Sequence, residues 1–132
     1  MRSLTVSMQQ PPRVIHPNGR TRKHKWRWRV VRDFRALVHS LAYCQIQEHF
    51  RGQPPMWPAA TAQVTIYYGR GQRRQDDDNL IAWLKPAFDG LQDAGVIAND
   101  RHLTHLPPIH ERDPAKPRVE ITIDAGPRKK KK

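Results

Sequence analysis

The chain of 132 residues lacks the features that mark secreted and membrane-spanning proteins. Its only cysteine, Cys44, excludes an internal disulfide bond. The first 13 residues contain no apolar segment of the kind found in signal peptides, and no run of about 18 apolar residues occurs anywhere. These absences predict a cytoplasmic protein with no membrane partner. Because Cys44 lies in an apolar stretch, we expect it to be a small buried residue rather than a nucleophile.

Acidic residues are scarce, and half of them lie in one short window. The chain has 24 lysines and arginines against 12 aspartates and glutamates, which gives a formal net charge of +12. Residues 76–100 contain six of these acidic residues and one lysine, so this window carries −5 and the other 107 residues carry +17. A basic surface attracts a polyanion, and gathered carboxylates suit a divalent cation. Because the basic residues are spread along the chain, nucleic acid is the expected partner.

The length is typical of a single domain, and the apolar periodicity predicts six elements within it. Strands are expected over residues 4–8, 62–68, 102–109 and 118–124, and helices over 29–50 and 79–94. This order, β-α-β-α-β-β, predicts an α/β (α+β) domain over residues 1–126, with a small mixed sheet and two main helices. Pro86 lies inside the second helix, where we expect a kink or a tightened turn. Residues 127–132 are expected to form a disordered basic tail.

Asp76, Asp78 and Asp100 are the candidate ligands for a divalent metal ion. Alternate carboxylates just before a helix can converge on one ion, and bound Mg²⁺ both activates water and neutralises phosphate charge. Without a cation, two carboxylates roughly 6 Å apart repel each other by about 3 kcal/mol at an effective dielectric near 20. Asp100 joins such a site only if the strands on either side of it are neighbours. The alternative for the aspartates is helix capping, which contributes about 1 kcal/mol for one N-cap residue.

Lys85 is a candidate catalytic residue on the second predicted helix. It follows Asp78 by seven residues, so both side chains lie on nearly the same face of a regular helix. A lysine on that face can contact a phosphate or stabilise a leaving oxygen. Alternatively, Lys85 forms an exposed i, i+4 ion pair with Asp89, which stabilises a helix by about 0.2–0.5 kcal/mol.

Basic residues in two loops are the candidate phosphate contacts. They are Arg20, Arg22, Lys23 and Lys25 before the first helix, and Arg70, Arg73 and Arg74 before the acidic window. Trp26 and Trp28 alternate with basic residues at the start of the first helix. This pattern suits either stacking of the indoles on DNA bases or anchoring of the indoles in the core. We expect Trp26 to face DNA and Trp28 to face the core, because alternate positions point to different faces.

The order and spacing of these motifs resemble the RusA-type Holliday junction resolvases, endonucleases common in bacteriophages and prophages. The matching pieces are a basic loop, the D-x-DN motif of residues 76–79, a lysine, FDGL at 88–91, AG at 94–95, and Asp100 before a strand. The resemblance is strongest from Arg73 to Asp124 and weaker in the first strand and loop. It implies a Mg²⁺-dependent endodeoxyribonuclease, with Mn²⁺ as a substitute, that resolves four-way DNA junctions by symmetric phosphodiester hydrolysis in recombination and repair.

The resemblance also implies roles for single residues and an assembly. Asp76, Asp78 and Asp100 correspond to catalytic metal ligands, and Lys85 corresponds to the essential lysine. A homodimer is implied because a four-way junction is two-fold symmetric, and the implied location is the cytoplasm of a bacterial host.

Departures from the family pattern leave some assignments open. The second helix has about one extra turn before Phe88, and Asp77 is an additional acid. The ion-binding pair is therefore either Asp76 with Asp78 or Asp77 with Asp78. The alternative functions are a non-catalytic DNA-binding module and a less selective nuclease for flaps or forks.

Overall fold

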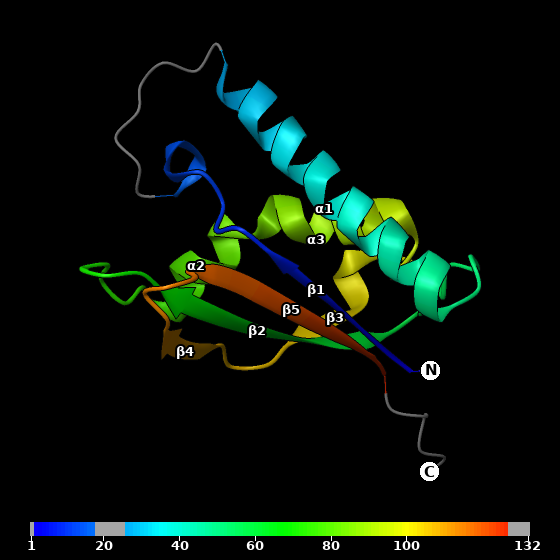
Figure 1. Cartoon of the computed structure of the whole chain (residues 1–132). Coiled ribbons are helices and arrows are strands. Elements are labelled where there is room, and N and C mark those ends of the chain that lie inside the picture. Colours follow the sequence, from blue (N-terminus) through cyan, green and yellow to red (C-terminus); the bar gives the residue numbers. More distant parts are fainter. Residues whose placement is uncertain (1, 18–25, 127–132) are drawn as a thin grey trace.

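The computed structural model describes residues 2–17 and 26–126 (Figure 1). The predicted tail at residues 127–132 lies outside this part of the chain. So do four predicted phosphate contacts, Arg20, Arg22, Lys23 and Lys25. The described residues form a mixed sheet packed against helices, which confirms the predicted α+β class.

Ten helical and strand elements follow one another along the described chain. They are β1 (Ser3–Met8), the 3₁₀ turn η1 (Arg13–Ile15), α1 (Arg27–His49), β2 (Ala60–Tyr68), α2 (Asp77–Trp83), α3 (Lys85–Ala94), the 3₁₀ turn η2 (Asp100–His102), β3 (Leu103–His105), β4 (Ile109–Arg112) and β5 (Arg118–Ala125).

The sheet has the order β1-β5-β2-β3, and β4 continues alongside β2. β5 lies between β1 and β2 and is antiparallel to both. β3 and β4 both run parallel to β2: β3 pairs with the beginning of β2 at Ala60, and β4 pairs with its end at Tyr68. In β1 and β5, Ser3 pairs with Asp124 and Met8 with Val119, so the first and last strands are neighbours.

Two predicted elements are each divided, and proline is the physical reason in both cases. The predicted helix over 79–94 is two helices that meet at Leu84, so the described domain has three α-helices rather than two. Pro86 lacks an N–H and disfavours helical geometry at the residue before it, so the expected disturbance occurs two residues ahead of the proline. The predicted strand over 102–109 is likewise two strands, because Pro107 and Pro108 cannot donate hydrogen bonds to the sheet.

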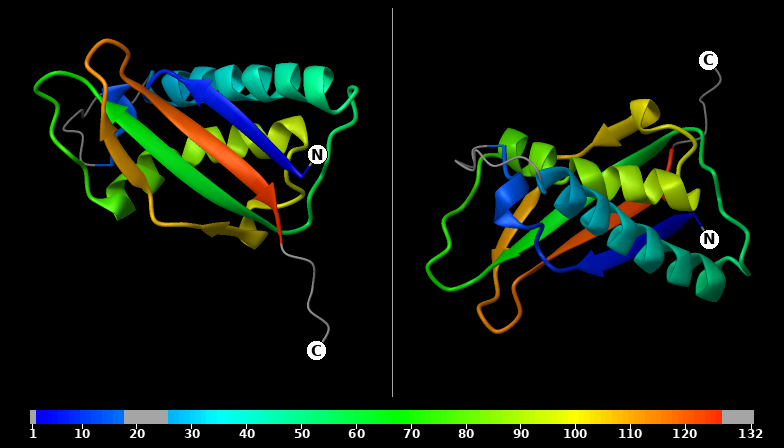
Figure 2. Two further views of the ribbon diagram at one scale, coloured as in Figure 1. Left: turned by 60° about the horizontal axis from the view of Figure 1, so that its bottom comes forward. Right: turned by 90° about the horizontal axis from the view of Figure 1, so that it is seen from above.

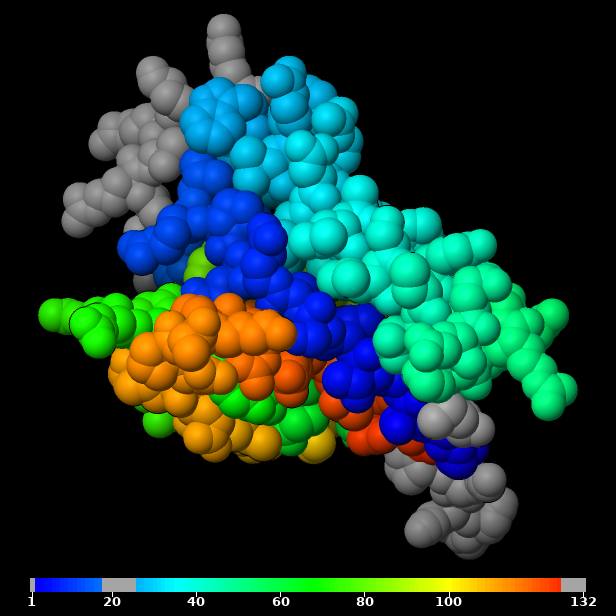
Figure 3. Space-filling view, in the orientation of Figure 1, coloured from blue at the N-terminus to red at the C-terminus, as the bar shows by residue number. Residues whose placement is uncertain are grey.

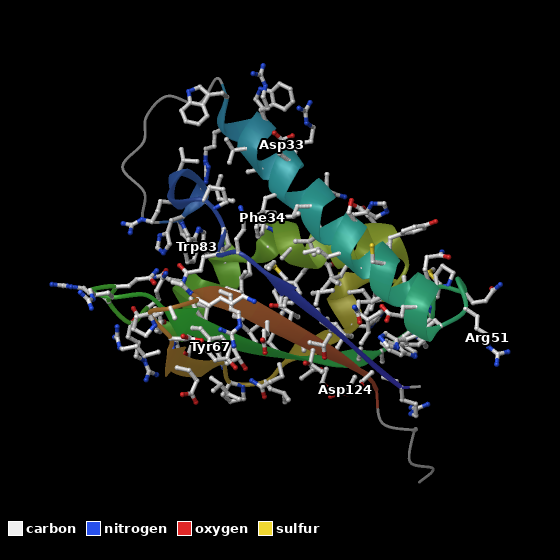
Figure 4. All side chains as sticks on the ribbon, viewed as in Figure 1. Asp33, Phe34, Arg51, Tyr67, Trp83 and Asp124 are labelled. Atoms are coloured by element: carbon white, nitrogen blue, oxygen red, sulfur yellow. The ribbon has the colours of Figure 1, made fainter. Side chains whose placement is uncertain are left out.

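Helices α1 and α3 cover one face of the sheet and leave its other face open (Figure 2). The side of α1 that faces the core buries Phe34, Val38, Ala42 and Ile46, which recur every four residues. Figure 4 shows Asp33 on the outer side of this helix and Phe34 on the inner side. Strand β2 alternates buried with partly buried residues, as expected for a sheet that is covered on one face.

Gly90 permits the close contact between α1 and α3. A Cβ atom at this position would lie 2.5 Å from the backbone oxygen of Arg35 and 3.1 Å from the backbone nitrogen of His39. Any side chain larger than a hydrogen would therefore push the two helices apart.

Cys44 is exposed, so the prediction that it is buried is wrong. The core positions of α1 include Ala42 and Ile46. Cys44 lies two residues from each, which is about 200° around a helix of 3.6 residues per turn. Among the described residues, no helix is both long and apolar enough to cross a bilayer.

Candidate functional site

The three consecutive aspartates follow the loop after β2, at the point where α2 begins. Asp76 occupies the N-cap position with an extended backbone, and Asp77 and Asp78 form the first turn. All three residues are exposed. The side chain of Asp76 makes no capping hydrogen bond, so its position is that of a cap while its carboxylate remains available. The capping interpretation therefore does not account for this carboxylate.

Asp77 is held by a histidine from the neighbouring strand β4. The Nε2 atom of His110 lies 2.7 Å from Oδ1 of Asp77, and its Nδ1 atom lies 2.8 Å from the hydroxyl of Tyr68. The ring of His110 stacks on that of Tyr68 with 8° between the planes, and its side chain is only 6% exposed. The backbone N–H of Gln75 donates to the Tyr68 hydroxyl at 2.9 Å. These contacts fix Gln75 and the Asp77 carboxylate to the sheet. Asp76, Asp77 and Asp78 are called the acidic row below.

Burial raises the pKa of Tyr68, so its phenol stays protonated at neutral pH. A protonated phenol that accepts from Gln75 can donate to Nδ1 of His110. With Nδ1 accepting from the phenol, the N–H at Nε2 of His110 donates to Asp77. The Asp77 carboxylate thus has an internal partner, whereas the carboxylates of Asp76 and Asp78 form no hydrogen bond or ion pair within the described chain.

A second polar cluster surrounds Lys85 at the start of α3. Its Nζ atom lies 2.9 Å from Oδ1 of Asp89 and 2.6 Å from Oδ2 of Asp100. The expected i, i+4 pair with Asp89 is therefore present, and Asp100 is an additional partner. Hydrogen bonds to Asp100 and Asp89 raise the pKa of Lys85. The backbone N–H of Asp100 donates to the side chain of Gln92 at 3.1 Å, which anchors the turn that carries Asp100.

The two clusters do not merge in this structure. Asp76 follows the end of β2 at Tyr68, whereas Asp100 precedes β3, which pairs with the beginning of β2 at Ala60. Within residues 2–17 and 26–126, no group of three or more His, Cys, Asp or Glu side chains is arranged to hold a metal ion. The metal site of Asp76, Asp78 and Asp100 therefore stays a prediction. Of the four predicted catalytic residues, only Asp100 and Lys85 are in direct contact.

Basic side chains surround the acidic row. Arg74 lines one surface hollow together with all three aspartates, and Arg73 and Arg74 line an adjoining hollow with Asp76. Arg70 is exposed in the same loop. Arg13 and His16, from the segment at η1, line the second hollow as well. Positive and negative side chains thus border one continuous concave surface.

The loop between β2 and α2 is held from two sides. The guanidinium of Arg112 donates to the backbone oxygens of Gly69 at 3.0 Å and Gln72 at 3.3 Å. Gln72 also exchanges side-chain hydrogen bonds with Gln10, at 2.6 and 3.1 Å. Figure 3 shows this loop, in green, projecting beside the orange turn that precedes β5. The loop therefore presents its arginines from an anchored base.

Trp28 is 57% exposed, so the prediction that it faces the core is wrong. It lies six residues before Phe34, which is about 240° around the helix from that core position. Trp26 is 46% exposed, which is compatible with the contact to DNA predicted for it.

Four residues that border or shape the site were not predicted from the sequence: Arg13, His16, Tyr68 and His110. The predicted strand over 62–68 ends at Tyr68, and the predicted strand over 102–109 ends one residue before His110. Alternation along β2 places Tyr68 on the buried face, and a buried phenol requires a hydrogen-bond partner, so a polar neighbour was foreseeable. No periodicity in the sequence identifies His110 as that neighbour.

No protein-family model matches the chain, and no curated protein matches it.

Proposed function

We propose that the chain is a divalent-metal-dependent endonuclease of the RusA-type Holliday junction resolvase family, with four-way DNA junctions as its substrate. The main observation behind this proposal is the exposure of the Asp76 and Asp78 carboxylates and their lack of internal partners. Both carboxylates are exposed, have no partner within the described chain, and border hollows lined by arginines. Free carboxylates beside cations suit an ion that bridges protein and phosphate.

The donor set fits Mg²⁺. This ion is usually bound through one or two carboxylates, with water and substrate phosphates completing its shell. Asp76 and Asp78 supply two hard oxygen donors, and Asp77 is occupied by His110. The contact to His110 favours Asp76 with Asp78 as the ion-binding pair. When bound, Mg²⁺ would lower the pKa of a coordinated water and neutralise charge on the phosphate.

The remaining residues have roles that follow from their positions. Arg73 and Arg74 would hold the phosphate backbone beside the carboxylates. The ammonium of Lys85 has three N–H donors, two of which bond Asp89 and Asp100. The third donor is left to contact a phosphate, and the carboxylates fix the direction of the side chain. Asp100 is then both the predicted third metal ligand and the residue that orients Lys85.

Symmetric cleavage of a two-fold symmetric junction requires two active sites in matching positions. A C2 homodimer is therefore part of the proposal. Sedimentation of the free protein and of its junction complex would test this, because a single protomer per junction contradicts paired cutting by one assembly.

The decisive experiment uses a synthetic mobile four-way junction with fluorescent labels on opposite strands. It is incubated with the protein in Mg²⁺, Mn²⁺ or EDTA, beside duplex and flap controls. We expect paired symmetric cuts in the junction that require the metal. Equal cutting of flaps would indicate the less selective nuclease, and metal-independent binding without any cut would indicate the non-catalytic module.

The assignment of residues is tested by Asp76→Asn, Asp78→Asn and Asp100→Asn. Each should abolish cleavage while junction binding stays intact or becomes tighter, because removing a carboxylate weakens the ion site and also reduces repulsion of phosphate. Lys85→Ala should reduce cleavage more than binding. Asp124→Asn, an exposed aspartate on β5, serves as the control. The assignment is wrong if two of the three site variants cut at close to the wild-type rate.

A further inference from the structure

Two indole side chains are exposed together at the start of α1. Trp26 immediately precedes this helix and is 46% exposed, and Trp28 is its second residue and is 57% exposed. Tryptophan is among the largest apolar side chains, and covering an indole removes a large area from water. The core does not use either ring, so packing within the domain does not explain these residues.

Arginine side chains surround the exposed indole of Trp28. The guanidinium carbons of Arg32 and Arg29 lie 5.1 Å and 5.9 Å from its ring centroid, within the range of cation–π contacts. Arg27 donates to the backbone oxygen of Ile15 at 3.3 Å, which ties the start of α1 to η1. Arg32 also forms an exposed pair with Asp33, whereas Arg27 and Arg29 have no ion pair within the described chain.

The stability of the helix does not explain this accumulation of positive charge. The first turn of α1 contains no acidic residue, and Trp26 makes no side-chain capping bond. Cations near the beginning of a helix interact unfavourably with its dipole. Several guanidinium groups therefore lie where they slightly destabilise the helix, and they lie beside aromatic rings that are exposed to solvent.

We propose that Trp26 and Trp28, with Arg27, Arg29 and Arg32, form a binding site for unpaired bases of single-stranded nucleic acid. Every base has a π face, so stacking on indoles tolerates any sequence, and guanidinium groups can both stack and contact phosphates. In a duplex the base faces are already stacked on each other, which leaves none for an indole. The charge of the patch fits the phosphate backbone of a single strand.

The patch of tryptophans and arginines lies near the carboxylates of Asp76 and Asp78. The proposed binding of single strands does not depend on these carboxylates. Arg27 contacts Ile15 in η1, and Arg13 of the same turn lines a hollow with Arg73 and Asp76. In Figure 1 the beginning of α1 lies above η1, at the end of the molecule where the loop after β2 projects. A strand bound at the indoles can therefore continue toward the acidic row. That continuation rests on the proposed nuclease function, whereas the binding site itself does not.

The test measures binding of the full chain to a fluorescein-labelled oligo(dT) in EDTA by anisotropy. The variants are Trp26→Ala with Trp28→Ala, Trp28→Phe, and Tyr43→Ala as control. Tyr43 is 55% exposed on the same helix, about 22 Å farther along its axis. We expect the double variant to bind about tenfold more weakly for each stacked base lost, while Trp28→Phe retains most of the affinity and Tyr43→Ala retains all of it.

The controls separate this inference from its rivals. The thermal unfolding of all variants should match that of the wild type, because the substituted side chains are exposed. Equal affinity of the double variant and the wild type for oligo(dT) would overturn the proposal. It would also be overturned if phosphatidylserine vesicles, and not oligo(dT), bound in a tryptophan-dependent manner. Because no metal is present, an absence of nuclease activity would leave these results unchanged.

Discussion

At the scale of single residues, the imidazole of His110 distinguishes three carboxylates that look equivalent in the sequence. It holds Asp77 at 2.7 Å and is itself stacked on Tyr68. One aspartate is thereby fixed to the sheet, and its neighbours on either side are left without partners. This hydrogen bond ties the first turn of α2 to β4.

Asp77→Asn is predicted to have little effect on cleavage or on Mn²⁺ binding. The amide oxygen of asparagine can still accept from Nε2 of His110, so the anchor is retained. Asp78→Asn provides the comparison, because it removes a carboxylate that has no internal partner. Mn²⁺ affinity by electron paramagnetic resonance and junction cleavage would both be measured. If Asp77→Asn reduced them as strongly as Asp78→Asn, Asp77 would be a metal ligand and the favoured pair would be wrong.

Local contacts of the site were predictable from the sequence, and contacts between distant segments were not. Asp76 to Asp78 at a helix start and the pair of Lys85 with Asp89 follow from spacing alone. The contact between Asp77 and His110 joins residues 33 positions apart. It depends on β4 lying parallel to the end of β2, and no periodicity in the sequence specifies that pairing.

At the scale of elements, the packing of α1 on α3 depends on Gly90. Gly90→Ala is predicted to lower the free energy of unfolding by about 1–3 kcal/mol, since the added Cβ would meet the backbone of α1. This loss should exceed the gain of up to about 1 kcal/mol that alanine brings to an exposed helix. Urea denaturation measures the difference.

Ser40→Ala is the control for this prediction, because Ser40 is an exposed residue of α1 and its substitution adds no atom to the helix contact. It should change stability by no more than about 0.5 kcal/mol. Equal or greater stability of Gly90→Ala relative to the wild type would show that the helices can separate without cost.

An ion pair between the same helices makes their contact sensitive to acid. Arg35 bonds Asp93 at 2.6 and 2.8 Å, and this hydrogen bonding lowers the pKa of Asp93 below its usual 3.8. A lowered carboxyl pKa contributes stability above the unfolded value, and the contribution is lost as pH falls through the folded pKa. We predict that Asp93→Asn is less stable than the wild type at pH 6 by no more than about 1 kcal/mol, because the pair is partly exposed.

The difference between Asp93→Asn and the wild type should shrink as the pH falls below 3.8, and thermal unfolding across this range would follow it. Asp33→Asn, in a more exposed pair with Arg32, should show a smaller difference at pH 6. A difference for Asp93→Asn that stays constant down to pH 2 would contradict the assigned cause.

Element types were predictable because apolar periodicity and proline act locally. From Leu80 to Leu91 the apolar residues at helical spacing are buried, and Pro86 predicted the disturbance within this stretch. The two short 3₁₀ turns have no such local signal in the sequence and were not predicted. Cys44 was placed on the wrong side of α1 because its apolar surroundings were given more weight than its angular position. Trp28 was placed there because alternate positions were expected to face opposite sides, whereas both tryptophans are exposed.

At the scale of the whole molecule, the net charge of +12 should make DNA binding steeply dependent on salt. Each phosphate contact contributes about −0.9 to the slope of log affinity against log salt concentration for duplex arms. The double substitution of Arg73 and Arg74 by alanine is predicted to reduce the steepness by about 1.8. Junctions of several sequences should bind with similar affinity, because phosphate contacts carry no sequence information.

Arg51→Ala is the control for the salt experiment. Figure 4 shows Arg51 at the opposite end of the molecule from Trp83, away from the proposed DNA surface. Its substitution should leave the slope unchanged. An unchanged slope for the Arg73 and Arg74 double variant would remove these residues from the contact surface.

The pairing of β1 with β5 also determines when the protein can fold during synthesis. Within the described chain β1 pairs only with β5, and β5 also pairs antiparallel with β2. A ribosome releases β1 before β5, so the sheet remains divided until β5 has been synthesised. Until then β1 and one side of β2 present unpaired backbone groups to other chains. A fragment released by a ribosome that stalls before β5 would therefore be prone to aggregation.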